Sequence, residues 1–339
     1  MRLALYGIIL INCIQYLYAI EYIYPINIDQ DNVTLLHQKS CNTTEILEWN
    51  IKTHRTTPLL WSIFNPTYCT ILPDKSGFSF IDNGRLRIKY FNKRSPKSLD
   101  FDIPFLYINA LQWIDENSCY CSAYLGSNFA ILKLFIDGTV EIVSADKKND
   151  YLYPCYCDEN IFFIERKKDA VNNIIDCTIL CKNMHMSIVT PILLFSNSLL
   201  VSLRMKSATE GFVLEYKNIN DATYTFIYHV FYYDTTIWQT KKLFDFTIPQ
   251  HLLKNDSSER IYESLLPFVP YHAHNRIYFV SSDANDTMNI FYYDTITQRT
   301  AIIDTIADKK CFFVPRVYNN VLLIGGIGAS ESDIKIIDF

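Results

Sequence analysis

The residues best suited to chemistry in this sequence are two Cys-Tyr-Cys triplets, one with thiols at Cys119 and Cys121 and one with thiols at Cys155 and Cys157. Side chains two residues apart on a β-strand point to the same face, so each triplet would aim two thiols in one direction. If the pairs met between neighbouring units, they could form a four-thiolate zinc site or two disulfides. The spacing is not the Cys-x-x-Cys knuckle, and buried thiols packed as small hydrophobic groups are the role we expect.

The stretch "YHAH" is a second candidate, because His272 and His274 are also two residues apart and precede a strand-like run. A His-x-His pair supplies two ligands of a metal site, and the sequence nominates no third. The oxygen-rich stretch "DANDT", residues 283–287, suits calcium by composition but lacks the EF-hand spacing. Zinc or calcium therefore stays open as a cofactor, and imidazoles packed among aromatic strands are the alternative.

Motifs for nucleophilic catalysis and phosphate binding are missing from the sequence. It contains no G-x-S-x-G elbow, no G-x-x-x-x-G-K-[ST] loop and no H-E-x-x-H helix. The stretch "GGIG", residues 325–328, lies before a strand-like run and does not open a helix. We therefore predict no catalytic and no cofactor-binding residue.

The elements that would position these residues follow from a repeated phrase. "FYYDT" occurs at residues 231–235 and 291–295, and looser copies recur every 42 to 60 residues. Each copy reads as a strand that ends at an Asp or Asn, whose side chain can close the following turn by accepting a bond from the backbone two residues on. A period of this length indicates stacked supersecondary units. The phrases end at Asn50, Asn92, Asp137, Asn183, Asp234, Asp294 and Asp338.

A second register of short polar turns between two apolar runs supports the same units. Two apolar runs, the phrase and a final strand would make one four-stranded antiparallel unit. Two insertions are predicted, one of them the stretch "EGFVLEYKNIND" within the fifth unit and the other at residues 249–268, between units. The polar turns are at residues 73–77, 115–117, 158–160, 196–198, 274–275 and 318–320.

With 24 Tyr, 22 Phe and only 9 Gly, and with these two registers, the chain resembles an all-β β-propeller of the broad kelch, WD40-like and TolB-like group. The double glycine Gly325-Gly326 is the most kelch-like feature, and no unit has the Gly-His and Trp-Asp pair of WD40 repeats. Seven phrases favour seven blades over six. The run "EYIYPINI", residues 21–28, is expected to pair with the last unit and close the ring.

The N-terminus carries one positive charge at Arg2 and then no charged residue until Glu21. This pattern predicts a signal peptide over residues 1–19, or an uncleaved anchor, ahead of a single propeller domain over residues 20–339. Both alternatives place the body of the protein outside the cytoplasm, whether periplasmic, secreted or anchored. Removal of Cys13 would leave nine of the ten cysteines, an odd number that leaves at least one thiol free.

A net charge of −5 and a pI near 5.8 give no basic footprint for nucleic acid. We expect a monomer with a protein partner, and contact with a membrane only through an uncleaved leader. The leading hypothesis is an exported propeller that serves as a protein-binding or envelope-associated scaffold. The alternative, implied by the resemblance, is a propeller hydrolase or lactonase-like enzyme with a metal or carboxylate site at the central channel.

Overall fold

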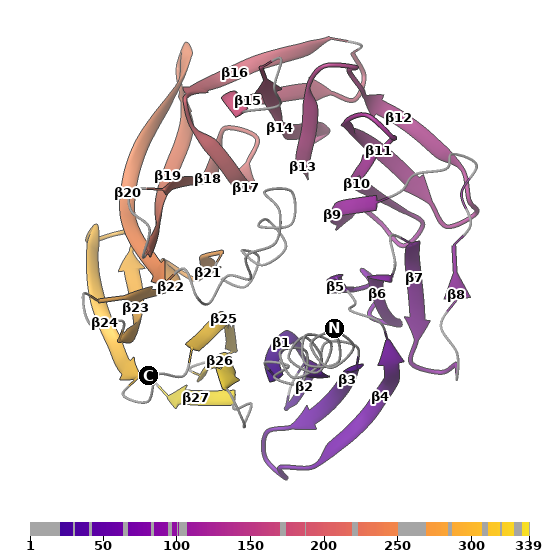
Figure 1. The fold of residues 1–339 in the computed structure, drawn as a ribbon, viewed down its shortest axis with the longest axis vertical. Helices are drawn as coiled ribbons and strands as arrows, with labels where there is room; N and C mark the ends of the chain where they lie inside the picture. Colours follow the sequence, from indigo (N-terminus) through magenta and orange to yellow (C-terminus); the bar gives the residue numbers. More distant parts are fainter. Residues whose placement is uncertain are drawn as a thin grey trace, which may run out of the picture.

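The computed structural model confirms an all-β propeller in which sheets follow one another around a common axis (Figure 1). The structure describes residues 21–29, 31–40, 43–63, 67–82, 85–93, 97–99, 101, 107–169, 174–186, 188–218, 223–249, 269–283, 287–306, 311–318, 321–328 and 334–338. No helix of membrane-spanning length and apolarity occurs in these ranges.

Five of the sheets are four-stranded antiparallel meanders. The first two comprise β5 (Thr67–Ile71), β6 (Gly77–Asp82), β7 (Arg85–Tyr90) and β8 (Lys97–Ser98), then β9 (Tyr107–Trp113), β10 (Ser118–Tyr124), β11 (Phe129–Phe135) and β12 (Val140–Ser144). The third comprises β13 (Asp150–Cys157), β14 (Asn160–Lys168), β15 (Ile174–Asn183) and β16 (Val189–Ser196). The fourth and fifth comprise β17 (Leu199–Ser207), β18 (Glu210–Asn218), β19 (Thr223–Asp234) and β20 (Ile237–Pro249), then β21 (Tyr271–Ala273), β22 (Arg276–Ser282), β23 (Met288–Asp294) and β24 (Arg299–Ile306).

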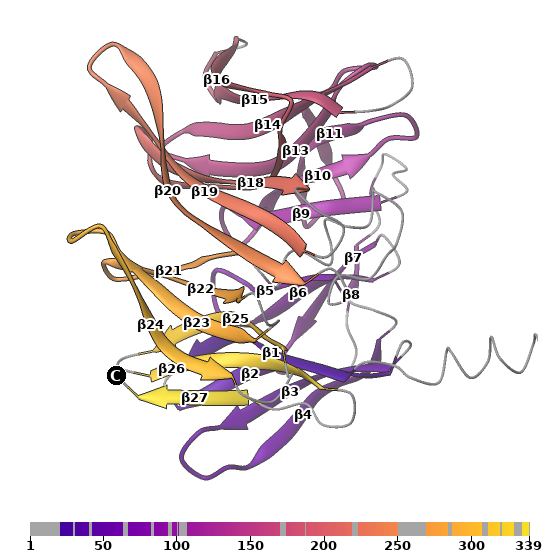
Figure 2. The same ribbon diagram turned by 60° about the vertical axis from the view of Figure 1, so that its left-hand side comes forward.

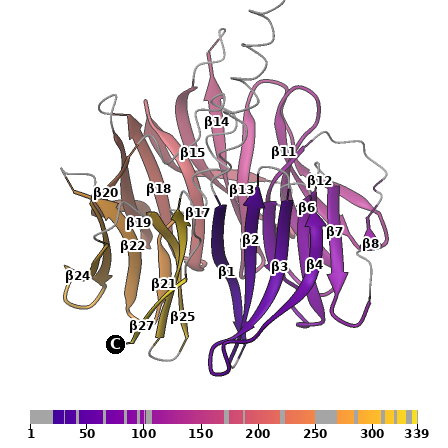
Figure 3. The same ribbon diagram turned by 60° about the horizontal axis from the view of Figure 1, so that its bottom comes forward.

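The sixth sheet joins the two ends of the chain (Figure 3). It contains seven strands: β1 (Glu21–Asp29), β2 (Asn32–Ser40), β3 (Thr43–Asn50), β4 (Thr56–Ile63), β25 (Cys311–Tyr318), β26 (Val321–Gly328) and β27 (Ile334–Asp338). The link between the two groups is short, because β1 pairs with β26 only through residues 21–23 and 326–328.

The prediction of seven blades closed by an N-terminal strand is therefore wrong. The strands form six sheets, because pairing of β26 with β1 merges the last three strands with the first four. The run at residues 21–28 is not an extra strand that completes the last unit. It is the first strand of its own meander and pairs along most of its length with β2.

The repeated phrase marks the third strand of its unit, at the ends of β3, β15, β19, β23 and β27 and just after β7 and β11. The expected turn closure is confirmed at several copies. The Asp294 Oδ1 atom accepts hydrogen bonds from the backbone N–H groups of Ile296 and Thr297 at 3.0 and 2.8 Å. Asp137 and Asn183 accept equivalent bonds from residues two positions on. A short polar side chain thus ends each of these strands by satisfying the turn backbone.

Two details of the fifth unit differ from expectation. The turn at 196–198 connects β16 to β17, so it joins two sheets and does not lie inside one. The stretch "EGFVLEYKNIND" is not an insertion, because Glu210–Asn218 forms the regular strand β18 between β17 and β19. The other expected insertion, residues 249–268, lies outside the described residues except for Pro249, the last residue of β20.

The largest apolar cluster fills the space between the β17–β20 and β21–β24 sheets. Alternation on β19 points Tyr224, Phe226 and Tyr228 into this cluster, and all three are at most 5% exposed. Across the interface the ring of Phe244 stacks on that of Phe279, with centroids 4.2 Å apart. Aromatic packing of this kind fixes how the two sheets face each other.

Candidate functional site

Figure 2 shows the β17–β20 and β21–β24 sheets as neighbours in the ring. A pocket of about 500 Å³ lies between them, where the apolar cluster that they share meets solvent. Its floor is apolar and includes Phe212, Val230 and Leu243. Its walls come from the end of β17, the start of β18, the start of β20 and the turns β21–β22 and β23–β24. A pocket of this volume with an apolar floor is typical of a site that binds a small ligand or a short peptide segment.

One row of four paired residues crosses the whole β17–β20 sheet at the pocket. Arg204 on β17 is opposite Phe212 on β18, which is opposite Val230 on β19, which is opposite Lys241 on β20. Directly paired residues of neighbouring strands point to the same face, so all four face the pocket that they line. The row therefore places an apolar centre between two cationic ends.

The pocket is strongly cationic. It is lined by Arg204, Lys206, Lys241 and Arg276 and by a single carboxylate, Glu210, which leaves a formal charge of +3 with neutral histidines. This stands against a net charge of −5 for the chain. Like charges held at one site raise the local positive potential and attract anions.

The four cations differ in how they are engaged. Lys206 forms an ion pair with Glu210 at 2.9 Å, and the Lys241 Nζ atom donates to the neutral amide of Gln298 at 2.9 Å. The guanidinium of Arg276 lies over the ring of Tyr292, 4.4 Å from its centroid. The exposed Arg204 side chain has no hydrogen bond or ion pair with another described residue. Arg204 is thus the cation whose donors are best placed to receive an anion.

The two turns on the far wall are tied together. His274 in the β21–β22 turn has φ of 53°, a left-handed conformation that His tolerates better than most residues. The backbone carbonyl of Asn275 accepts from both the N–H and the hydroxyl of Thr295, at 2.8 and 2.9 Å. This contact joins the β21–β22 turn to the β23–β24 turn and holds the wall in place.

His272 lies in the pocket wall and is half-buried. Its Nε2 atom shares a 2.7 Å hydrogen bond with the hydroxyl of Tyr228, and its ring lies 4.3 Å from that of Phe212. Burial, together with the charges of Arg204 and Lys206, lowers the pKa of His272 to about 3. The imidazole is therefore neutral at physiological pH and is a poor proton acceptor.

Of the six residues that the sequence nominated as metal ligands, the structure brings only His272 and His274 to the pocket. Cys119 and Cys121 lie on β10 in a different apolar cluster, where burial raises the pKa of both thiols. Cys155 lies on β13 behind the pocket wall, and its sulfur accepts a bond from the backbone N–H of Met205 at 3.2 Å. All seven cysteines with described side chains are free thiols.

No group of three or more His, Cys, Asp or Glu side chains suited to holding a metal occurs in the described part of the chain. The stretch at residues 283–287 is described only at its ends, where Asp283 accepts a bond from the backbone of Thr287 at 3.0 Å. At these two ends the carboxylate serves to close a loop.

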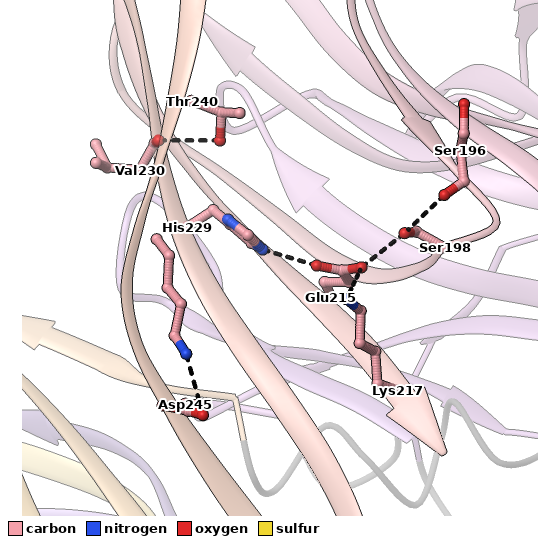
Figure 4. A network of polar contacts seen from close by, with 9 residues as sticks. Ser196, Ser198, Glu215, Lys217, His229, Val230, Thr240 and Asp245 are labelled. Atoms are coloured by element: carbon pink, nitrogen blue, oxygen red, sulfur yellow. Dashed lines mark hydrogen bonds and ion pairs between the residues drawn. The ribbon is translucent and has the colours of Figure 1, made fainter. Parts of the chain in front are cut away.

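On the opposite face of the β17–β20 sheet lies a buried polar network centred on Glu215 (Figure 4). Its carboxylate accepts hydrogen bonds from His229 at 2.8 Å and from Ser198 at 2.6 Å, and Lys217 lies 3.6 Å away. Burial alone would raise the pKa of Glu215, but these bonds and the Lys217 charge lower it to about 2. The network joins β18 and β19 to Ser198 in the turn before β17, on the face of the sheet that is turned away from the pocket.

The residues that give the pocket its charge were not among the sequence candidates. Their signal was present in "RMKSATEGF", where Arg204 and Lys206 are two residues apart before a turn and Phe212 follows it. Assignment of the residues from Glu210 onward to an insertion concealed the hairpin. Correct placement of the β17–β18 turn would have put both cations on one face.

The sequence matches no protein-family model and no curated protein. Solved structures similar to it include the polysaccharide lyase PL25, an ulvan lyase, with 11% identity, coverage of 95% of this chain and 94% of that chain, and a TM-score of 0.59. The β-propeller domain of the trilobed protease from Pyrococcus furiosus has 10% identity, coverage of 94% and 95%, and a TM-score of 0.56. An oligogalacturonate lyase has 8% identity, coverage of 94% and 97%, and a TM-score of 0.53.

At these identities the likenesses concern the fold alone, and both enzymes and a propeller domain of a larger protein are among them. No kelch or WD40 family is shown. In its fold, the chain is a β-propeller.

Proposed function

We propose that this protein is an exported propeller that works by binding, and that the pocket between the β17–β20 and β21–β24 sheets receives an acidic segment of a protein partner. The observation that carries the proposal is the formal charge of +3 on the pocket lining of a chain whose net charge is −5. The exposed Arg204, with no partner among the described side chains, offers a planar set of donors that matches a carboxylate.

Placement of the site also supports binding. The pocket is built from hairpin ends, and its floor offers Val230 and Leu243, both half-buried, to an apolar part of the partner. An apolar floor with a few placed polar groups provides affinity through burial and orientation through hydrogen bonds. Export is proposed from the uncharged N-terminal run and gives such a partner an envelope or extracellular location.

An enzyme at this pocket has less support. His272 with a pKa near 3 is three to four units less basic than a free imidazole, and proton transfer is most efficient when the catalytic pKa lies near the working pH. The single lining carboxylate, Glu210, is already paired with Lys206. The pocket therefore offers recognition groups, and neither His272 nor Glu210 is well suited to act as a base at neutral pH.

The test is a calorimetric titration of the purified protein with a glutamate-rich peptide and with a lysine-rich peptide of equal length. We expect only the acidic peptide to bind. Arg204→Gln should weaken its binding about tenfold, because one charge-assisted hydrogen-bonding group is lost. Added salt should weaken binding in the wild type.

Lys242→Gln is the matched control. Lys242 precedes Leu243 on β20, but it pairs with His229 on the other face of the sheet and contacts Asp245 at 3.1 Å. The Lys242→Gln variant loses one positive charge, as Arg204→Gln does, but its pocket lining is unchanged. Its affinity for the acidic peptide should therefore equal that of the wild type. If both variants lost the same affinity for the acidic peptide, the effect would come from net charge and not from the pocket. If the acidic peptide did not bind to the wild type, the proposal would be refuted.

A further inference from the structure

The row across the β17–β20 sheet has an order that a merely positive surface would lack. Arg204 and Lys241 are at its two ends, and Phe212 and Val230 lie between them. Leu243 widens the apolar centre, because β20 has an irregularity between the pairs Tyr228–Phe244 and His229–Lys242 and Leu243 is the extra residue there. A ligand that lies along the row meets a cation, an apolar surface and a second cation.

The length of the row follows from sheet geometry. Three steps between neighbouring strands separate β17 from β20, and each step is about 4.8 Å, so the row spans about 14 Å. An extended peptide rises about 3.3 Å per residue, so four residues cover about 13 Å. Two side chains four positions apart on an extended segment therefore match the two ends of the row.

Both end cations keep capacity for a ligand. Arg204 forms no hydrogen bond or ion pair with another described side chain. Lys241 donates to Gln298, whose amide is neutral, so its charge is not compensated and its ammonium retains further protons to donate. Lys206, in contrast, is already neutralised by Glu210 through contacts of 2.9 Å to both carboxylate oxygens.

We propose that the segment bound in this pocket is an extended peptide with two acidic residues four positions apart and apolar residues between them. One acid pairs with Arg204 and the second acid pairs with Lys241. The apolar side chain midway between them, which points to the same face as both acids, covers Val230 and Leu243. This inference rests on the proposed function, since it specifies the residue pattern of the acidic segment. It adds a spacing requirement that simple attraction of acids to a cationic pocket does not have.

Three blocked peptides test the spacing by calorimetry: ELVLE, its permutation EELVL and the single-acid peptide ELVLQ. ELVLE and EELVL have the same charge and composition. We expect ELVLE to bind at least about fivefold tighter than either, since only it reaches both cations. In Lys241→Gln the advantage of ELVLE should disappear, and in the control Lys242→Gln it should remain.

The outcomes separate the two proposals. Equal affinity of ELVLE and EELVL, with both weakened by Arg204→Gln, would overturn the spacing and leave the acidic ligand in place. Retention of the ELVLE advantage in Lys241→Gln would likewise overturn the assignment of the second acid to Lys241. Failure of all three peptides and of the glutamate-rich peptide to bind would overturn both proposals. Lys241 is exposed, so the variant should fold, and circular dichroism with thermal unfolding checks this.

Discussion

The hydroxyl of Tyr228 on β19 lies 2.7 Å from the Nε2 atom of His272 on β21, and this hydrogen bond joins two neighbouring sheets of the propeller. Tyr228 is 2% exposed and belongs to the apolar cluster between the sheets. The bond satisfies the buried hydroxyl of Tyr228 and fixes the orientation of the imidazole in the pocket wall.

Tyr228→Phe should destabilise the protein by about 1 to 2 kcal/mol, because His272 loses its partner in a half-buried position. Urea unfolding at neutral pH measures the change in the free energy of unfolding. Tyr232→Phe is a suitable control, since its hydroxyl bond to Gln239 is longer, at 3.3 Å, and less buried. A loss in Tyr228→Phe no larger than in the control would show that the bond contributes little.

The pKa of His272, lowered to about 3 by burial and by Arg204 and Lys206, predicts a specific titration. The unfolded chain binds a proton at this residue below its ordinary pKa near 6.5, whereas the folded chain does not until about pH 3. His272 therefore favours folding above pH 6.5, and this contribution is lost as the pH falls from 6.5 towards 3. Proton NMR of the imidazole should show no titration above about pH 4.

In Arg204→Gln the His272 midpoint should rise, since one of the two repelling charges is gone, but it should stay below 6.5 because burial is the larger cause. An unchanged midpoint in that variant would show that Arg204 lies farther from the imidazole than the structure has it. A His272 titration midpoint near pH 6.5 in the wild type would show that its surroundings do not lower its pKa.

Glu215 carries the second pH prediction. Its pKa is lowered to about 2, so its contribution to stability is present above its unfolded pKa of about 4.3 and is lost as the pH falls from 4.3 towards 2. Glu215→Gln should destabilise the protein at neutral pH by about 2 to 4 kcal/mol, because His229 and Lys217 lose their buried anion. The variant should also lose part of the acid dependence of unfolding.

Glu141 on β12 is exposed and provides the control. Glu141→Gln should change the free energy of unfolding by no more than about 0.5 kcal/mol at any pH between 2 and 7. Chemical unfolding at a series of pH values between 2 and 7 measures both variants. Parallel curves for the wild type and Glu215→Gln over this range would contradict the assigned role of the network.

The thiols should react in a defined order. Burial raises the pKa of all three thiols, and Asp158 adds to the effect at Cys157, but Cys157 is half-buried whereas Cys119 and Cys121 are at most 1% exposed. Since the thiolate is the reactive form, native protein should be alkylated at Cys157 well before Cys119 and Cys121, which should react only after unfolding. Peptide mass mapping after timed alkylation measures this order. Early modification of Cys119 would show that β10 opens readily.

The repeat and its turns could be predicted from sequence because they are local. Asp294 and Asp137 end their strands through bonds to backbone groups two or three residues away, and such chemistry is visible in a short window. The number of sheets could not be predicted in this way, because it is set by a long-range contact. It depends on three residue pairs between β1 and β26, about three hundred residues apart, and no pattern within either strand specifies that pairing.

The pocket could not be predicted from the sequence either, because its residues are brought together by pairing between separate strands. Arg204 and Lys241 are cations in separate strands, and only the registers through Phe212 and Val230 put them in one row. The sequence did place His272 and His274 correctly beside a strand and a turn. The surroundings of His272 come from the neighbouring sheet, which supplies its hydrogen-bond partner Tyr228. Burial, with the two cations of β17, keeps the imidazole neutral by lowering its pKa.

The most direct test of the account is a crystal structure of the protein with the ELVLE peptide. We predict that the peptide lies in the pocket between the β17–β20 and β21–β24 sheets, with one carboxylate within hydrogen-bonding distance of the Arg204 guanidinium and the other of the Lys241 ammonium. A peptide bound elsewhere on the propeller, or one whose carboxylates point to solvent while its apolar side chains fill the pocket, would contradict it.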